Sequence, residues 1–138
     1  MFGQYLLSAP HNLRRLWAEG ARRVRAVRER RKTIEEFRKA RGIRLLREWL
    51  SPEQQAQFDA FRHFDVIGCD TGSRYRIRHG TQTNIHEIDA EGHPIAGWCF
   101  IPSGPLVAGD VMLAQKIALE TNERAALAIA NRFAVVRR

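Results

Sequence analysis

Residues 74–79, with the sequence RYRIRH, alternate strictly between arginine and a ring or aliphatic side chain. Successive side chains of a β-strand point to opposite faces of its sheet. The alternation therefore predicts a strand with Tyr75 and Ile77 turned toward a core and all three arginines turned the other way. Gly80 is expected to end this strand, because glycine readily leaves the extended conformation.

Further strands are predicted on both sides of this stretch. Residues 64–73 contain a short run rich in β-forming side chains and then a turn. Residues 83–88 predict a third strand, and the uneven alternation of Ile85 and Ile88 indicates a bulge in it. Residues 95–101, IAGWCFI, are apolar on both faces, so we expect both faces to be covered. The sequence thus predicts an antiparallel meander of about four strands.

Helices are predicted before and after the meander. Residues 51–54, SPEQ, begin a helix, because serine caps it, proline suits its first position and glutamine reaches back to the cap. We expect this helix to run to about residue 63 and to bury Phe58 and Phe61. A long C-terminal helix is expected from its cap at Asp110 to about residue 132, over a run without Gly or Pro. The predicted fold class is α+β, with the small sheet packed on the C-terminal helix.

An amphipathic helix is predicted ahead of this domain. Apolar residues recur there at spacings of three and four, which predicts one apolar stripe made of Leu13, Leu16, Trp17, Ala21, Val24 and Val27. A capping box of Thr33 and Glu36 indicates a kink or a new start near Thr33, and Gly42 is expected to end the helix. We therefore expect a basic helical arm over residues 1–50 and a small α+β domain over residues 51–138.

The positive charge of the chain lies in the expected arm. Residues 1–50 hold 14 Lys and Arg against 5 Asp and Glu, whereas residues 51–138 hold 9 against 10. The chain has 20 Arg and only 3 Lys. Arginine binds phosphate in a bidentate manner, so this bias suits nucleic acid, although a GC-rich genome would also raise the arginine content. A basic arm on a near-neutral domain indicates a polyanion or an acidic protein as partner.

We therefore expect a non-catalytic nucleic-acid-binding protein that contacts phosphates through the arm. The candidate residues in the arm are Arg14, Arg15, Arg22, Arg25, Arg28, Arg30 and Arg31. A second set lies at intervals of about 6–7 Å along the predicted strand and consists of Arg74, Arg76 and Arg78. That spacing is close to the spacing of phosphates in an extended single strand. The alternative for this second set is a solvated strand face whose charges protect a sheet edge.

Other functions of the arm stay open at this point. Its apolar stripe suits an adaptor or assembly protein that binds an acidic protein partner or a copy of itself. The arm also fits a plain surface helix, or a helix lying on an anionic membrane. No segment approaches the ~20 apolar residues of a membrane-spanning helix, and the first residues do not resemble a secretory signal. We therefore expect a cytoplasmic protein without integral membrane association.

Catalytic and metal sites have little support in the sequence. Cys69, Cys99, His79 and His86 lie on or beside predicted strands, but their spacing matches no zinc motif. Cys69 as a nucleophile with His79 or His86 as its base would need a third group to orient the base. The charged side chains of the last helix, Glu123 included, are expected on its solvated side. We expect no enzymatic activity, no cofactor and no metal.

Part of the chain carries a pattern known from other proteins. It consists of Phe64, Val66, Gly68, Gly72, Tyr75, Ile77, Gly80, Asn84, Cys99, Phe100, Pro102, the run DVMLAQK over residues 110–116, Leu119, Glu120, Ala130 and Asn131. With this pattern, residues 64–131 resemble a family of uncharacterised small proteins of bacteria and phages. The resemblance covers about half of the chain, leaves out the arm, and implies no activity, cofactor or partner.

Overall fold

The computed structural model describes residues 10–136 and contains three helices and five strands in that range. In chain order these are α1 (His11–Trp49), α2 (Pro52–Phe61), β1 (His63–Ile67), β2 (Arg74–Arg78), β3 (Ile85–Ile88), β4 (Pro94–Cys99), α3 (Ala108–Ile129) and β5 (Asn131–Phe133). The strands form one antiparallel sheet in the order β1-β2-β3-β4-β5. The predicted α+β class is confirmed, with five strands where about four were expected.

The alternation of the central strand is borne out by the burial of its side chains. Tyr75 and Ile77 of β2 are 1% and 0% exposed. The expected bulge is present in β3, where the pairing with β4 shifts between Glu87 and Ile88. The prediction that β4 is covered on both faces is wrong at Ile95, which is 46% exposed. Ile95 lies on the opposite face of β4 from the buried Ala96, because successive side chains of a strand alternate between the faces of the sheet.

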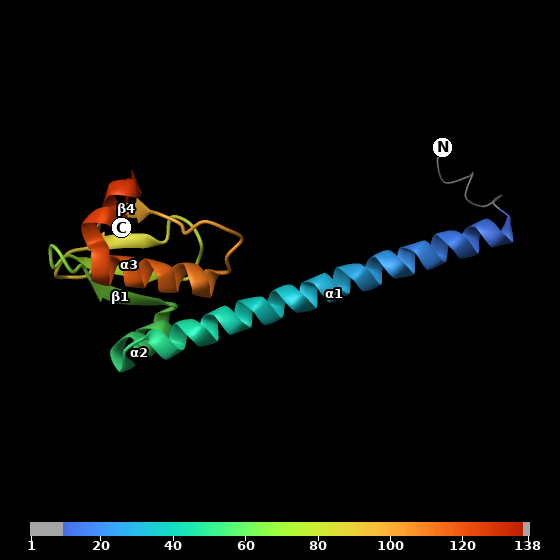
Figure 1. Cartoon of the computed structure of the whole chain (residues 1–138), viewed down its shortest axis with the longest axis horizontal. Helices are drawn as coiled ribbons and strands as arrows, with labels where there is room; N and C mark the ends of the chain where they lie inside the picture. Colours follow the sequence, from blue (N-terminus) through green and yellow to red (C-terminus); the bar gives the residue numbers. More distant parts are fainter. Residues whose placement is uncertain (1–9, 137–138) are drawn as a thin grey trace. The chain divides into compact units, whose positions relative to one another are not determined.

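The hydrophobic core lies between the sheet and the helices. Helix α3 packs along one face of the sheet, as Figure 1 shows, and contributes Met112 and Leu119, both fully buried. The other core side chains come from all parts of the domain and are Leu46, Leu50, Phe58, Phe64, Val66, Tyr75, Ile77 and Ile85. Because Leu46 lies near the end of α1, this helix contributes to the core as well as to the arm.

Helix α1 is one unbroken helix of 39 residues, so the expected interruptions are wrong. Thr33 does not cap a new helix, because its hydroxyl donates to the carbonyl oxygen of Glu29 at 2.9 Å, within the same helix. Gly42 does not end the helix but is buried inside it. The chain forms two compact units, of which one ends at Phe37 and the other begins at Arg38. Residues 38–50, expected in the arm, therefore belong to the second unit.

A close contact between two glycines explains why Gly42 is buried. A Cβ atom built on Gly109 would lie 2.2 Å from the carbonyl carbon of Gly42, and one built on Gly42 would lie 2.7 Å from the Val107 side chain. The backbones of α1 and α3 thus touch at a distance that leaves no room for a side chain. The sequence pattern indicated a helix stop at Gly42, whereas the structure uses this glycine for packing.

Helix α2 begins as predicted. The Ser51 hydroxyl accepts from the N–H of Gln54, and the Gln54 side chain accepts from the N–H of Ser51. Phe58 is buried, but the expected burial of Phe61 is wrong, because this ring is 67% exposed and stacks on His63. The helix ends there because Arg62 adopts a left-handed conformation with φ 59°.

Helix α3 differs from its prediction at both ends and in the middle. It begins at Ala108 after Val107, which makes no side-chain cap, so Asp110 is not the cap. It ends at Ile129, because the residues that follow form β5. Its backbone leaves the helical conformation at Asn122, with φ −154° and ψ 52°.

We predict that Gly109→Ala destabilises the protein. The new methyl group would overlap the backbone of Gly42, which cannot rotate away as a side chain would. Overpacking of this kind costs about 1–3 kcal/mol, so the melting temperature should fall by roughly 5–15 °C. Thermal unfolding followed by circular dichroism measures the change. An unchanged melting temperature would show that the helices separate easily at this contact.

Candidate nucleic-acid interface and the polar sites of the domain

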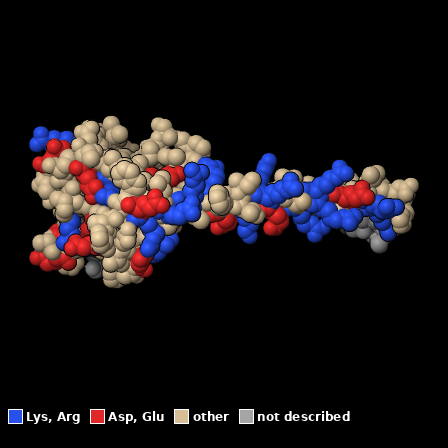
Figure 2. Space-filling view, turned by 60° about the horizontal axis from the view of Figure 1, so that its bottom comes forward, with Lys and Arg blue, Asp and Glu red and all other residues tan. Residues whose placement is uncertain are grey.

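The described part of the first unit, up to Phe37, is mostly an exposed basic helix that begins at His11. Every residue from His11 to Phe37 is exposed apart from Glu19, which is partly exposed. This stretch carries nine Lys and Arg against four Glu. All seven arm arginines proposed from the sequence lie on it. On the face that Figure 2 shows, Lys and Arg predominate along the exposed part of α1, with some acidic side chains between them, whereas acidic and basic side chains are mixed over the domain.

The arginines of α1 do not all lie on the same side of the helix. At 3.6 residues per turn, Arg15, Arg22 and Arg25 fall within one arc of about 80°. The centre of the apolar stripe lies on the opposite side. Arg22 and Arg25 also donate from Nε to the carbonyl oxygens four residues before them, at 3.4 and 3.5 Å. Helix α1 thus presents one basic and one apolar side.

The strand arginines lie on one face of the sheet, as predicted, but two of them have an acidic partner. Arg74 Nη2 and Arg76 Nε lie 3.0 and 2.8 Å from the carboxylate of Asp65 on β1. The Asp65 side chain is only 8% exposed. Burial alone would raise the pKa of Asp65, but the hydrogen bonds from Arg76 and Arg74 outweigh it and hold the pKa below its ordinary value. Arg74 and Arg76 therefore neutralise a buried acid.

Arg78 differs from its two neighbours on the strand. It is exposed, and its Nε donates to Nδ1 of His86 at 3.3 Å. Burial and the positive charges of Arg78 and Arg76 lower the pKa of His86, so this ring stays neutral and can accept. Of the three strand arginines, Arg78 is the one with no acidic group as its hydrogen-bond partner.

The most extensive polar site in the domain surrounds Glu123, which is fully buried. Its carboxylate accepts from the backbone N–H groups of Asp70 and Thr71 at 2.8 and 2.9 Å. It also accepts from the hydroxyls of Thr71 and Tyr75, both at 2.5 Å. We call these four hydrogen bonds the Glu123 network. The expectation that Glu123 lies on the solvated side of its helix is wrong, because the β1–β2 turn covers it.

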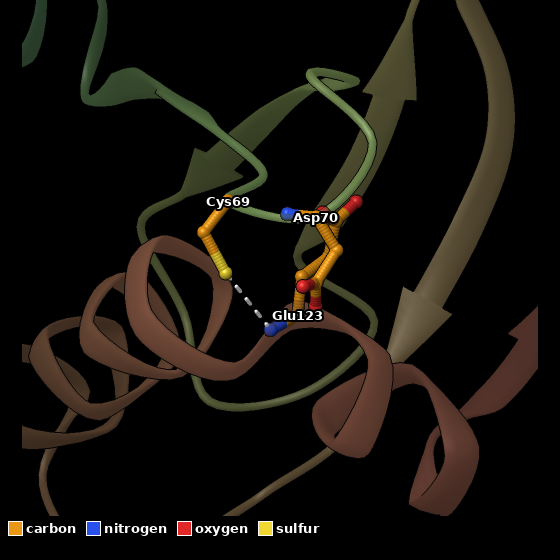
Figure 3. A group of neighbouring side chains, drawn as sticks. All are labelled: Cys69, Asp70 and Glu123. Atoms are coloured by element: carbon orange, nitrogen blue, oxygen red, sulfur yellow. Dashed lines mark hydrogen bonds between the residues drawn. The ribbon is translucent and has the colours of Figure 1, made fainter.

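The same turn also satisfies the backbone of α3 where this helix is broken. Cys69 donates its N–H to the carbonyl oxygen of Leu119 at 3.1 Å. Its sulfur accepts from the N–H of Glu123 at 3.5 Å, and Figure 3 draws this bond as a dashed line. Asp70 accepts from the N–H of Arg124 at 2.9 Å, as a capping residue would. The break at Asn122 is therefore stabilised from outside the helix.

Cys69, Asp70 and Glu123 also form a group of potential metal ligands, whose ligand atoms lie within 4.8 Å of one another (Figure 3). A carboxylate offers about four lone-pair positions, and the Glu123 network uses four. The sulfur of Cys69 and the carboxylate of Asp70 accept hydrogen bonds from the backbone N–H groups of Glu123 and Arg124. This arrangement fits a structural role, and the hydrogen bonds of the network occupy the acceptor positions of the Glu123 carboxylate.

The other residues considered for a zinc site do not join this group. Among residues 10–136, no group of three potential ligands contains Cys99, His79 or His86. The Cys99 sulfur accepts from the N–H of Thr83 at 3.5 Å. Burial, followed by the charge of Arg62, lowers the pKa of His79. The structure thus brings no two of the four proposed residues together in such a group.

The ionisation of the Glu123 network follows from its geometry. Burial would raise the pKa of Glu123, but the hydrogen bonds from Thr71, Tyr75 and the backbone outweigh it and lower the pKa. Burial and the Glu123 carboxylate together raise the pKa of Tyr75, so its hydroxyl stays protonated and donates. A Cβ at Gly68 would lie 2.2 Å from the Glu123 carboxyl carbon, so only glycine fits there.

The side-chain amides of Asn84 and Gln115 form a buried pair that the sequence did not predict. Asn84 and Gln115 donate to each other at 2.8 and 2.9 Å, and Gln115 also donates to the carbonyl oxygen of Phe100 at 3.1 Å. Both side chains are buried, at 4% and 0% exposure. The pair ties α3 to the β2–β3 loop and to the end of β4. Both residues belong to the pattern of the resemblance, which was the only signal for them in the sequence.

We predict that Glu123→Gln lowers the free energy of unfolding by about 2–4 kcal/mol, because an amide cannot accept four hydrogen bonds. Tyr75→Phe, which removes one donor, should cost about 1 kcal/mol. The folded-state pKa of Glu123 is lowered, so its stabilisation is complete above pH about 4.5 and is lost as the pH falls through the folded-state pKa. The difference between wild type and Glu123→Gln should therefore shrink in acid.

Chemical denaturation between pH 7 and pH 3 measures this difference. The control is Glu91→Gln, which removes an exposed carboxylate and should leave stability nearly unchanged. A pH-independent difference for Glu123→Gln would contradict an ionised carboxylate in the network.

We predict that Arg76→Glu strongly destabilises the domain, whereas Arg78→Glu does not. The first change would place a second carboxylate beside the buried Asp65, which costs about 3 kcal/mol or more. Arg78→Glu alters the net charge by the same amount at a position two residues further along the same face. It removes only the contact with His86. Thermal unfolding of both variants decides the point. Equal melting temperatures would show that Asp65 does not depend on Arg76.

Within residues 10–136, no helix is long and apolar enough to cross a membrane. No family model, curated protein or solved structure matches the chain, so the fold and the sites rest on the structure itself.

Proposed function

We propose that this is a non-catalytic nucleic-acid-binding protein that contacts phosphates through helix α1. The observation that carries the proposal is the exposed basic stretch of α1, with nine Lys and Arg against four Glu between His11 and Phe37. A charge density of this kind attracts a polyanion and releases its counterions.

The length of this stretch suits the backbone of a nucleic acid. Twenty-seven helical residues extend for about 40 Å, which is somewhat more than one turn of a DNA duplex. Arg15, Arg22 and Arg25 lie on one side of the helix and can contact neighbouring phosphates together. Arginine contacts to phosphates fix position without reading bases, so we expect little sequence preference.

The sheet arginines support the proposal less than the arm does. Arg74 and Arg76 pair with Asp65, and a phosphate would have to compete with this buried carboxylate. Arg78 is exposed and remains a candidate for an auxiliary contact. We therefore base the proposal on α1.

We also propose that the protein acts in the cytoplasm, because its two cysteines are free.

The exposed apolar side of α1 favours a second candidate function, which is that of an adaptor or assembly protein. Leu16, Trp17 and Phe37 are 64%, 70% and 67% exposed. Phosphate contacts would not cover these side chains, whereas a protein partner would. The two functions use different sides of one helix and can be tested separately.

We predict that the double variant Arg22→Ala with Arg25→Ala weakens binding to DNA or RNA. Each lost phosphate contact should lower the slope of log K against log salt by about 0.9, so the double variant should lose roughly 2. Fluorescence anisotropy with a labelled duplex and a labelled single strand, at several salt concentrations, measures both quantities. The protein must first be freed of nucleic acid with nuclease and high salt.

The matched control is the double variant Arg124→Ala with Arg132→Ala, which has the same net charge. Both residues are exposed on the domain. The control should bind nearly as tightly as wild type, with a similar salt slope. If both double variants lose the same affinity, the contacts are not specific to α1. If wild type does not bind either probe at low salt, the proposed function is wrong.

A further inference from the structure

The apolar side of α1 has the spacing of a coiled-coil seam. Residues recur every three or four positions from Leu13 to Ile34, which is the heptad pattern. The seam positions are Leu13, Trp17, Gly20, Val24, Val27, Arg31 and Ile34, and Leu16 and Phe37 lie beside them. The seam extends for about 32 Å along the helix.

These side chains are open to solvent in the structure. Trp17 is 70% exposed, Ile34 62% and Val24 51%. Apolar side chains that are exposed by chance are scattered singly over a protein surface. Apolar side chains that line up along one side of a helix over this length mark a contact with another protein. The seam therefore needs an occupant.

Gly20 leaves room for another chain to come close to the helix. Glycine weakens the interior of a helix, so its presence there needs a reason. No described atom lies within 4 Å of the position that a Cβ of Gly20 would take. Nothing within the described chain therefore requires glycine at this seam position. A missing side chain leaves room for a large one from a neighbouring helix.

We propose that the seam pairs with the same seam of a second copy of this chain, in antiparallel orientation. Pairing about a centre between Arg25 and Ala26 brings together seam residues whose numbers add up to 51, and flanking residues whose numbers add up to 49 on one side and 53 on the other. Each contact then occurs twice, as two-fold symmetry requires. This proposal goes beyond nucleic-acid binding and uses the other side of the helix.

The register explains the sizes of the seam residues. Trp17 lies opposite Ile34 of the second copy, and Val24 lies opposite Val27. Arg31, the one charged residue of the seam, lies opposite Gly20. Its aliphatic stem can cross the helix there and carry the guanidinium to water. The longest polar side chain of the seam thus faces the one residue without a side chain.

The residues that flank the seam also favour this register. Leu16 lies opposite Phe37 of the second copy, which adds apolar contact on both sides. Arg14 lies opposite Glu35, which adds opposite charges. Arg23 lies opposite Arg30, and this repulsion at the solvated rim is screened by salt. Two apolar and two opposite-charge pairs outweigh two like-charge pairs.

A parallel pair would be less favourable. Identical residues would then face each other, so Arg31 would meet Arg31 inside the contact. Gly20 would meet Gly20 and leave a hole. In the flanking positions of a parallel pair, Arg23 would lie beside Arg28 and Arg30 beside Glu35, so these charges offset each other. The sequence of the seam therefore selects the antiparallel arrangement.

The first test is the mass of the nuclease-treated, full-length protein. Sedimentation velocity should show twice the 15.9 kDa of one chain, with dissociation on dilution. Val27→Asp should give a monomer, because it places charge in the seam. Ala26→Asp adds the same charge one residue away and outside the seam, and it should remain a dimer. Unfolding curves of both variants should match wild type in the domain.

The second test fixes the orientation by exchanging charges. Arg14 and Glu35 are about 31 Å apart along one helix, so they cannot touch within one chain. Arg14→Glu and Glu35→Arg should each weaken the dimer about tenfold, because each change affects two symmetric pairs. The double variant should restore the wild-type dissociation constant within about threefold. A parallel dimer would show no such restoration.

Some outcomes would overturn the proposal. A monomer at every concentration would leave the seam to a helix of another protein, and a dimer that survives Val27→Asp would place the contact elsewhere. Arg22→Ala with Arg25→Ala lies outside the seam and should not change the mass. Loss of nucleic-acid binding and loss of the dimer are therefore distinguishable.

Discussion

The buried carboxylate of Glu123 is the constraint on which the construction of the domain depends. A charge without hydrogen-bond partners at full burial is strongly unfavourable, and three donors of the β1–β2 turn and the Tyr75 hydroxyl of β2 offset this penalty. In return, the break at Asn122 directs two helix N–H groups toward Cys69 and Asp70. The turn and the break thus satisfy each other's polar groups.

Most of the ionic and buried polar side chains described above for the domain bind other groups of the same domain. Asp65 is held by Arg74 and Arg76. Asn84 and Gln115 satisfy each other across the sheet and α3. Such groups specify one arrangement of the core and offer little to a ligand. This is the physical reason to assign function to α1, whose charged residues before Phe37 remain in contact with water.

Helix α1 shows how one periodic sequence serves two environments. Near its C-terminal end, Gly42 and Leu46 are buried, and the closeness of Gly42 to Gly109 leaves no room for a side chain. Before Phe37, apolar residues at the same spacing are exposed. Our proposals assign the basic side of this exposed part to phosphates and its apolar side to a second chain, so nucleic-acid binding and self-association would not compete for the same residues.

Local signals in the sequence determined the α+β class, the strand at residues 74–79, the cap of α2 at Ser51, and the basic and apolar sides of the arm. Each depends on neighbours in the chain, where periodicity and capping are decided. Only the tertiary structure decided that Asp65 pairs with the strand arginines, that Glu123 is buried, and that β5 forms from three residues without alternation. Glu123 and its partners lie about fifty positions apart, and the chain must fold before such groups can meet.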